Sequence, residues 1–361
     1  MERRVTLKDI AREANVSVGT VDRAIHDRGR INEEKRDLIL QKIKDMNYKT
    51  NTIARTLRKN EAIRIALVIP DYNYFFQDII AGAQKACSEM ANYNIQLELV
   101  TQDTENDPIL QMKDFSRALQ KKPNGILVAP LHPLLCREVI DNAVEQGIPV
   151  MTVNLEAKSS KRLCYIGQDS YKTGMIIGRI FGKILRGQGR VAILSSITDL
   201  ISLQDRAKGF LDVLRADFPG ITVTEEYPYS DDIAIAYETS KALIRSDSEL
   251  AGIFANSTRG TIGIGQALVE LNKTDSIVAV CYDTQKEVLD LLDQNAVFAT
   301  VTQNPYEQGH RAVRLMCEVL LDQTIPAHEY WYTRADVIIS RDQLIVNEST
   351  QYEERRTNPP G

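Results

Sequence analysis

Hydrophobic and polar residues alternate along this chain in two different ways. Up to about residue 50, apolar residues recur at intervals of three and four, as they do on one face of an amphipathic helix. From Ile63 onward, short runs that are almost entirely apolar are separated by longer stretches with helical spacing. The change predicts a small helical head followed by a larger region in which strands and helices take turns.

Three short helices are predicted in the head. Thr6, Ser17 and Asn32 each stand directly before a helical stretch, where a polar N-cap is expected. The positions expected to face a shared core are Leu7, Ile10, Ala11 and Ala14 in the first helix, Val21, Ala24 and Ile25 in the second, and Leu38, Ile39 and Ile43 in the third. Two helices joined by a tight turn and followed by a third are typical of a helix-turn-helix DNA-binding domain.

In such a domain the second helix enters the major groove of DNA with its N-terminal residues in front. The residues expected to face DNA are Val18, Gly19, Thr20, Asp22 and Arg23, and the capping residues Thr6 and Ser17 are expected to contact it as well. Arg23 can bind guanine through two hydrogen bonds and Val18 can contact a thymine methyl group, whereas Gly19 has no side chain with which to read a base. The alternative for the head is a three-helix bundle that binds another protein.

The connector NTIARTLR, residues 51–58, is predicted to be a short helix that needs a partner. Asn51 stands at the N-cap position, and Ile53 and Leu57 lie four residues apart on one face. Isolated helices shorter than roughly 12 to 15 residues are marginal in water. Something outside the monomer must therefore complete this helix.

Nine apolar runs in the larger region are predicted to be strands. The first set is 63–69, 95–101, 125–130 and 148–154, and the second set is 190–194, 221–227, 250–256, 276–283 and 297–303. Strands that alternate with helices predict doubly wound parallel sheets of the α/β class, and the two sets predict two lobes. Ligands of such sheets bind at the carboxyl ends of the strands, which here places a ligand in a cleft between the lobes.

Polar and aromatic residues gather after these strands. The candidate ligand-binding residues are Asn73, Phe75, Phe76, His132, Asn154, Asp169, Arg206, Ser257, Asp283 and Gln303. Amides, carboxylates and a guanidinium beside aromatic rings suit a ligand rich in hydroxyl groups, because their edges form hydrogen bonds and the rings stack on the ligand face. The other interpretation is that each of them is an ordinary loop or cap residue.

The distribution of charge supports a division of labour between head and body. Residues 1–60 hold 15 Lys or Arg against 9 Asp or Glu, whereas the remainder holds 29 against 40, within a net charge of -5. A cationic head on an acidic body suggests that the head alone meets a polyanion. No apolar run is long enough to span a membrane and the N-terminus lacks a signal-peptide core, so we expect a cytoplasmic protein.

The sequence offers little support for catalysis. The five cysteines are scattered and are expected to be reduced core thiols, so no metal site is predicted, and no cofactor either. The glycines at 260, 263 and 265 follow a strand but lack the dinucleotide-binding order, which weakens the alternative of a nucleotide-dependent enzyme. The four histidines have no spacing of a triad or metal site. An exported sugar-binding protein and a constitutive architectural DNA binder are the remaining alternatives.

The first 60 residues resemble the lactose-repressor (LacI/GalR) family of bacterial transcription regulators. The resemblance is carried by V-S-x-x-T-V at the second helix, by N-Y before the connector and by N-x-x-A-x-x-L within it. It implies that the connector is a hinge helix that folds on operator DNA and pairs with a second copy in the minor groove. Leu57 would wedge between base pairs, and Ala54 would let the two helices approach closely. Most family members carry serine where this chain has Asp22.

The body, roughly residues 63–340, resembles the type I periplasmic sugar-binding fold, and in particular ribose-binding proteins. The resemblance implies that Asn73, Phe75 and Phe76 lie at one wall of the cleft. It further implies that sugar hydroxyls are bound by Asn154, Arg206, Asp283 and Gln303. Two departures stand out, because Asn154-Leu155 replaces the usual Asp-Arg and Ser257-Thr258 replaces the usual Asn-Asp.

Together these observations predict a ligand-responsive transcription regulator. We expect a DNA-binding head (1–50), a hinge (51–61), an effector-binding and dimerisation body (62–346) and a disordered polar tail (347–361). The expected partners are a near-palindromic double-stranded operator, a second copy of the chain and a sugar or sugar derivative. A repressor that releases DNA on binding its effector fits this organisation best.

Overall fold

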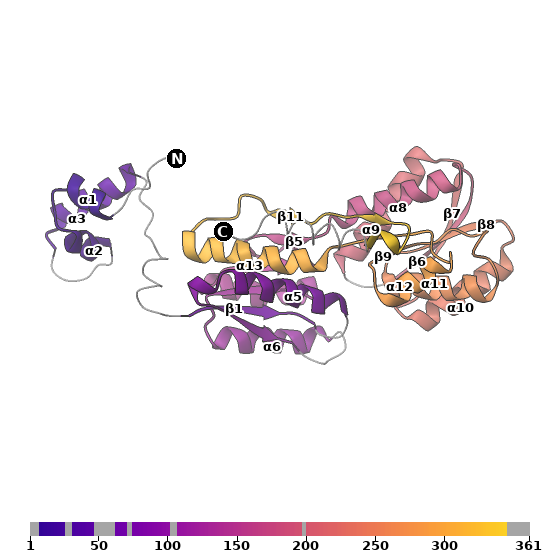
Figure 1. The fold of residues 1–361 in the computed structure, drawn as a ribbon, viewed down its shortest axis with the longest axis horizontal. Helices are drawn as coiled ribbons and strands as arrows, with labels where there is room; N and C mark the ends of the chain where they lie inside the picture. Colours follow the sequence, from indigo (N-terminus) through magenta and orange to yellow (C-terminus); the bar gives the residue numbers. More distant parts are fainter. Residues whose placement is uncertain are drawn as a thin grey trace. The chain divides into compact units, whose positions relative to one another are not determined.

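The computed structural model describes residues 7–25, 31–46, 62–70, 74–101, 107–196 and 200–344 (Figure 1). The chain divides into two compact units, of which one comprises residues 1–62 with 317–325 and the other comprises 63–316 with 326–361. Some predicted features lie outside the described residues. They are Thr6, the hinge helix with Asn51, Ala54 and Leu57, the cleft residue Asn73, the side chains of Leu7, Asp22 and Ile25, and the polar tail.

Three helices form the head, and their apolar faces meet in one small core. The helices are α1 (Leu7–Glu13), α2 (Val18–Ile25) and α3 (Glu33–Asp45). The core consists of Ile10, Ala11, Ala14, Val21, Ala24 and Ile39. Two predicted caps are confirmed, because Ser17 Oγ accepts a hydrogen bond from the Thr20 N–H (3.2 Å) and Asn32 Oδ1 accepts one from the Glu34 N–H (2.9 Å).

The prediction for Leu38 was wrong. Its side chain is 47% exposed, whereas Ile39 is fully buried and Ile43 packs partly buried against the core. Successive residues of a helix are turned by about 100° around its axis, so Leu38 and Ile39 cannot both face the same narrow core. The two short helices opposite α3 cover only the face that carries Ile39 and Ile43.

The first lobe of the body is built on a six-stranded sheet in the order β11-β5-β4-β3-β1-β2, in which every pair is parallel. Its strands are β1 (Ile63–Val68), β2 (Ile95–Val100), β3 (Gly125–Val128), β4 (Val150–Val153), β5 (Tyr165–Gly167) and β11 (Tyr330–Tyr332). Its helices include α5 (Tyr74–Glu89), the 3-10 turn η1 (Ala91–Tyr93), α6 (Pro108–Gln120) and α7 (Pro133–Glu145). Figure 1 shows α5 and α6 on opposite faces of this sheet.

The second lobe repeats this strand order. Its strands are β6 (Gly189–Ser195), β7 (Ile221–Pro228), β8 (Leu250–Ala255), β9 (Val280–Tyr282), β10 (Ala299–Val301) and β12 (Val337–Ile338). The groups β7-β6-β8 and β9-β10-β12 are joined by a parallel bridge between Gly252 and Val278. The helices are α8 (Ser170–Ile184), α9 (Ile201–Asp217), α10 (Ile233–Ser246), α11 (Thr258–Glu270) and α12 (Lys286–Asp293). The predicted α/β class with two lobes is confirmed.

Alternate residues of the second sheet pack against different helices. On β6, Val191 and Ile193 join a core with α8 and α9, whereas Ala192 and Leu194 join a core with α10 and α11. Side chains of a strand point to opposite faces in turn, so a strand covered on both faces must be apolar at every position. This is why the predicted strands appear in the sequence as continuous apolar runs.

The chain passes between the lobes three times, through residues 168–169, 302–304 and 333–336. The crossing segments are hydrogen-bonded to one another. Gln168 Nε2 donates to the Thr302 carbonyl (2.8 Å), the Thr333 N–H donates to the Gly167 carbonyl (2.8 Å), and Thr333 Oγ1 donates to the Gln303 carbonyl (2.9 Å). The helix α13 (Pro305–Asp322) begins after the second crossing. Three segments that are hydrogen-bonded to one another therefore form the joint between the lobes.

Two glycines bring α8 and α9 into backbone contact. A Cβ atom on Gly174 would lie 2.1 Å from the Arg206 carbonyl oxygen, and a Cβ on Gly209 would lie 2.1 Å from the Tyr171 carbonyl oxygen. Neither distance leaves room for a side chain. The close approach holds the N-terminal half of α9, which carries Arg206, against the start of α8.

The cysteines agree with the prediction of reduced core thiols. All five are free, four of them are buried, and Cys87 is half-buried. No group of three or more His, Cys, Asp or Glu side chains suited to a metal ion occurs within the described ranges. Over the same ranges, every helix is too short or too polar to span a bilayer.

Candidate functional site

Asn154 and Asp283 occupy matching places in the two lobes. Asn154 follows β4 and Asp283 follows β9, which is the corresponding strand of the second sheet. Both residues adopt the left-handed conformation, with φ of 63° and 67°. Apart from glycine, Asn and Asp tolerate this conformation best. The chain therefore turns sharply at both positions and leaves an amide and a carboxylate at the carboxyl edges of the sheets.

The carboxylate of Asp283 is buried and receives one hydrogen bond on each oxygen. Gln303 Nε2 donates to Oδ1 (2.8 Å) and Thr258 Oγ1 donates to Oδ2 (2.7 Å). Burial raises the pKa of Asp283, while the charge of Arg206 and the two hydrogen bonds partly offset this effect. Because a carboxylate offers about four acceptor positions, Asp283 retains acceptors for the hydroxyl groups of a ligand.

Gln303 connects the two lobes at this site. Its Oε1 accepts a hydrogen bond from Asn154 Nδ2 (3.4 Å), while its Nε2 donates to Asp283. The backbone carbonyl of Gln303 accepts hydrogen bonds from Thr333 Oγ1 and Gln308 Nε2, both at 2.9 Å. Since Gln303 lies on a crossing segment, the path from Asn154 to Asp283 follows the joint between the lobes.

Arg206 reaches the site from α9 and is fixed on several sides. Its guanidinium carbon lies 3.8 Å from the centre of the Tyr282 ring, which is a cation–π distance. Nη2 donates to Gln168 Oε1 (3.1 Å) and Nη1 donates to the Asn256 carbonyl (3.4 Å). The Nε–H is buried without a partner. Arg206 thus supplies a buried positive charge and one hydrogen-bond donor that is not used.

An aromatic wall and a cavity complete the cleft. Phe75 and Phe76 at the start of α5 are buried and meet edge to face, with ring centres 5.6 Å apart. A cavity of about 470 Å³ lies beside Phe75, and Phe75, Asp283 and Gln303 are among its lining residues, whereas Phe76 is not. This volume falls within the range of small-molecule sites in proteins.

Three other predicted residues act as helix caps. His132 Nδ1 accepts from the Leu135 N–H (3.4 Å), Asp169 Oδ1 accepts from the Lys172 N–H (3.1 Å), and Ser257 Oγ accepts from the Gly260 N–H (3.2 Å). All three lie at the carboxyl edges of the sheets. Their side chains are used by the fold, and a contact with ligand remains a prediction for each of them.

Several residues at the cleft were not predicted from the sequence. Thr258 holds Asp283, Tyr282 stacks on Arg206, and Gln168 bonds Arg206. Tyr282 directly precedes Asp283 in an apolar strand, and Gln168 directly precedes Asp169 after β5, so adjacency to predicted residues was their only signal. Their roles depend on side chains from distant segments.

A further polar network, in the second lobe, joins Tyr229, Asp231 and Ser257. The Ser257 hydroxyl donates to Asp231 Oδ1 (2.5 Å), and the Tyr229 hydroxyl lies 2.7 Å from Ser257 Oγ. Burial raises the pKa of Asp231, and the Ser257 hydrogen bond acts in the opposite direction. Asp231 and the preceding Ser230 both have positive φ, which concentrates strain at this turn.

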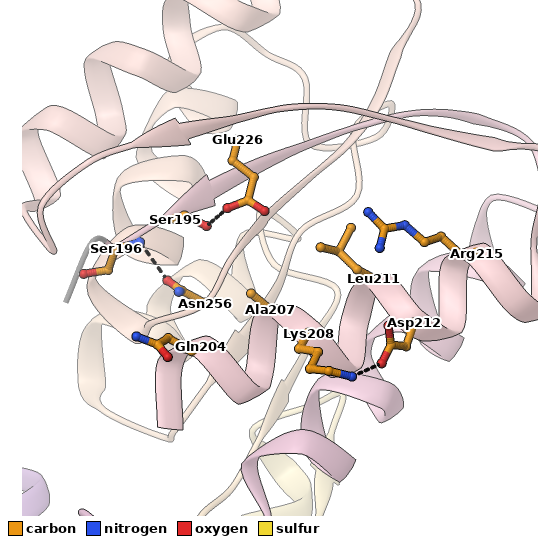
Figure 2. A pocket seen from close by; sticks show the side chains of 10 residues that line it. All are labelled: Ser195, Ser196, Gln204, Ala207, Lys208, Leu211, Asp212, Arg215, Glu226 and Asn256. Atoms are coloured by element: carbon orange, nitrogen blue, oxygen red, sulfur yellow. Dashed lines mark hydrogen bonds and ion pairs between the residues drawn. The ribbon is translucent and has the colours of Figure 1, made fainter. Parts of the chain in front are cut away.

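A separate cavity of about 390 Å³ lies in the second lobe. Figure 2 shows its lining side chains, which come from α9 and from the ends of β6 and β7 among others. Four of its polar side chains form two pairs, since Ser195 Oγ donates to Glu226 (2.7 Å) and Lys208 pairs with Asp212 (2.5 Å). None of the residues predicted to bind ligand lines this cavity. We therefore do not include it in the candidate site.

The residues of the head that are predicted to face DNA lie on the first turns of α2. Ser17 Oγ and Thr20 Oγ1 lie 2.8 Å apart, and Arg23 Nη2 donates to Thr20 Oγ1 (3.3 Å). Val18 and Gly19 are exposed beside them. The hydrogen bonds run along one side of the helix and hold the Arg23 side chain close to its surface.

The glycines that prompted the nucleotide-binding alternative are packing residues. All three lie in α11, where a Cβ on Gly263 would be 2.6 Å from the Ile233 carbonyl oxygen and a Cβ on Gly265 would be 2.7 Å from a Leu291 methyl carbon. Gly260 is equally close to the ring of Tyr229. The absence of side chains lets α11 pack against α10 and α12.

Comparisons with known proteins cover both parts of the chain. Residues 6–51 match the family described as bacterial regulatory proteins, lacI family, and residues 65–324 match the family described as periplasmic binding protein domain. The chain is 25% identical to the HTH-type transcriptional regulator RegA of Clostridium saccharobutylicum over 96% of this chain and 99% of that protein. It is 27% identical to the ribose operon repressor of Bacillus subtilis over 89% and 93% of the two chains.

Solved structures resemble the body. The sugar-binding protein of a sugar ABC transporter from Bacillus halodurans has a TM-score of 0.73 at 23% identity and covers 78% of this chain and 98% of its own. GanP, a glucose-galactose binding protein from Geobacillus stearothermophilus, has a TM-score of 0.71 at 25% identity, with coverage of 77% and 97%.

A helix-turn-helix head and a two-lobed body with a polar cleft define the class of ligand-responsive DNA-binding regulators. The family matches of the head and of the body make the assignment to a family specific. This chain belongs to the lacI family of bacterial transcriptional regulators, with a body of the periplasmic binding protein domain family. The lacI match over the head also argues against an exported transport protein.

Proposed function

We propose that this regulator binds a sugar or a sugar derivative between the two lobes of its body, and that the ligand sets the affinity of the head for an operator. The observation that carries the proposal is the hydrogen-bonded path from Asn154 through Gln303 to Asp283. The path contains donors and acceptors from both lobes at the joint itself. A ligand with several hydroxyl groups can bond to all of these residues and hold the lobes together.

The chemistry of the cleft supports a carbohydrate. Asp283 accepts hydrogen bonds, Arg206 donates them, and the amides of Asn154 and Gln303 do both. Phe75 offers an apolar ring at the cavity, where the face of a sugar ring can stack. The relatives point the same way, since they include a ribose operon repressor and a glucose-galactose binding protein.

The small size of the head supports a model in which two copies of the chain bind a near-palindromic operator together in the cytoplasm. A single DNA-binding module of this size buries only about 600 to 1,000 Å² on DNA, so useful affinity requires two heads. Helix-turn-helix dimers read two half-sites related by the symmetry of the protein. Repression follows if the operator overlaps a promoter, and the relative from Bacillus subtilis is named as a repressor, that of the ribose operon.

In this proposal, ligand binding in the cleft affects operator binding by the heads because it changes the distance between the two hinge segments of the dimer. Ligand that closes the cleft turns the lobes about the three crossing segments. In a dimer this moves the two chain segments that lead to the heads. If the new separation prevents the hinge helices from pairing, the protein loses its minor-groove contacts and releases the operator.

Thermal unfolding of the full-length protein tests the proposal. The panel is D-ribose, D-glucose, D-galactose, D-arabinose and their phosphates, and we expect at least one of them to raise the unfolding temperature by mass action. Asp283→Asn should abolish that shift but leave operator binding intact, whereas the exposed control Asp275→Asn should keep both. A panel without any shift, or an unchanged shift in Asp283→Asn, would contradict the proposal.

A further inference from the structure

The cavity of the candidate site is lined by an excess of carboxylates from both lobes. Asp78 belongs to α5 of the first lobe, whereas Asp283 and Glu287 belong to the second lobe. Among the lining residues that the structure describes, the only lysine or arginine is Lys286, and its Nζ pairs with Asp290 Oδ2 (2.6 Å), which does not line the cavity. A ligand in this cavity therefore meets a negatively charged surface.

Asp78 has no cationic partner within the described ranges. No ion pair or hydrogen bond joins its carboxylate to another described residue, and burial raises its pKa without an opposing charge. Asp283 differs, because burial raises its pKa and the charge of Arg206 partly offsets this effect. The first lobe thus contributes a negative charge to the cavity that the described part of the chain leaves unbalanced.

Asp78 also lies beside the aromatic wall of the cleft. It follows Phe75 by three residues in α5, so the two side chains share one face of the helix. Both of them line the same cavity. A cation in contact with Asp78 would therefore lie near an aromatic ring, whose face attracts positive charge. Two separate features favour a cationic group at this end of the cavity.

An ammonium group meets the requirements of this end of the cavity. Its three N–H donors can bond to a carboxylate and to neighbouring acceptors at the same time. Opposite charges attract each other more strongly at a partly buried site than in water, because the effective dielectric constant is lower. A phosphate or carboxylate on the ligand would be repelled. The amides of Asn154 and Gln303 remain suited to hydroxyl groups.

We propose that the ligand of the cleft is an amino sugar, and that Asp78 selects it by pairing with its protonated amino group. This inference rests on the proposed function of the cleft and names the class of ligand within it. A neutral sugar can form the same hydroxyl contacts but leaves Asp78 without a partner. A sugar phosphate adds a negative charge to a cavity that already has an excess of them.

Calorimetric titration of the full-length protein tests the proposal. D-glucosamine, D-galactosamine and D-mannosamine are each compared with the parent sugar, with the N-acetyl derivative and with the 6-phosphate of the parent sugar. We expect at least one amino sugar to have a dissociation constant about tenfold or more below those of its parent sugar and its N-acetyl derivative. The phosphate should bind more weakly than the parent sugar.

Asp78→Asn removes the charge but keeps the size of the side chain. It should reduce the preference for the amino sugar over its parent to about twofold or less, whereas the exposed control Asp275→Asn should retain the preference. Because the Asp78 side chain is exposed, the unfolding temperature of Asp78→Asn without ligand should not fall.

Four results would overturn the proposal. They are an amino sugar that binds no more tightly than its parent, a phosphate that binds more tightly than both, a preference that survives in Asp78→Asn, and a preference that is lost together with stability. In each of these cases the binding of sugar in the cleft would still stand. If neither amino sugars nor neutral sugars bind, the proposed function fails as well, which separates the two failures.

Discussion

At the scale of single residues, the cleft is dominated by charge that has been removed from water. Arg206 and Asp283 are both buried, and each is held by hydrogen bonds to neutral side chains. Charges of opposite sign lower each other's cost of burial, yet the pKa of Asp283 remains raised. The site therefore costs stability without ligand, and a ligand whose hydroxyls bond to the carboxylate recovers part of this cost.

Asp283→Asn should change how stability depends on pH. An acid whose pKa is raised on folding stabilises the folded state only at low pH, and its contribution is lost as the pH rises from about 3.9 through the raised value. The variant cannot titrate there, so its stability relative to wild type should improve from pH 4 to pH 7. Urea unfolding at several pH values measures the difference. If the free energy of unfolding of the variant minus that of wild type stays constant or falls as the pH rises, the result would disagree with the burial of this carboxylate.

At the scale of elements, the helix pair α8 and α9 places the arginine of the cleft. Gly174 and Gly209 bring the two helices together, and the result is that Arg206 lies over Tyr282 and beside Gln168. The contact between α8 and α9 contributes both to the packing of the second lobe and to the position of Arg206 in the site. Loosening it should affect both.

Gly209→Ala should destabilise the body and weaken ligand binding. The added methyl group would lie 2.1 Å from the Tyr171 carbonyl oxygen, so the helices must separate. Overpacking of this kind costs about 1 to 3 kcal/mol. Urea unfolding and sugar titration of the same preparation measure the two effects, with Arg215→Ala on the exposed side of α9 as the control. Equal stability of Gly209→Ala and wild type would show that the helices have room.

The hinge is the second element whose role can be tested, although it lies outside the described residues. The resemblance to the lacI family predicts that Leu57 inserts between base pairs, and Leu57→Ala should then weaken operator binding by removing the wedge. Sugar affinity of the free protein should stay nearly the same. Fluorescence anisotropy with specific and random DNA distinguishes this effect from a general loss of affinity. Equal operator binding by both proteins would rule out the wedge.

At the scale of the whole molecule, sugar binding and operator binding must affect each other reciprocally. If bound sugar lowers operator affinity by some factor, bound operator must lower sugar affinity by the same factor. Couplings of this kind typically amount to roughly 5- to 150-fold. Operator titrations at zero and saturating sugar give one value, and calorimetric sugar titrations with and without operator give the other. Unequal factors would mean that the cycle includes a further binding event.

The sequence by itself predicted the three helices of the head and nine strands of the body, but it did not predict the short strands β5, β11 and β12. Ser17 and Asn32 cap helices because their side chains bond to backbone within three residues. The runs around Val191 and Ile253 form strands because both faces of their sheet are covered. These signals depend on residues that are close together in the sequence, so they can be recognised without knowledge of the fold. Leu38 shows the limit, because the choice between it and Ile39 depends on where the other helices lie.

Only the tertiary structure decided which residues meet. Asn154 and Gln303 are 149 positions apart, and their contact exists because the chain crosses between the lobes three times. Gln168 carries no signal of its own, since an amide is ordinary in a loop until a buried charge lies beside it. Contacts between distant segments depend on how the whole chain closes, and no pattern within one segment contains that information.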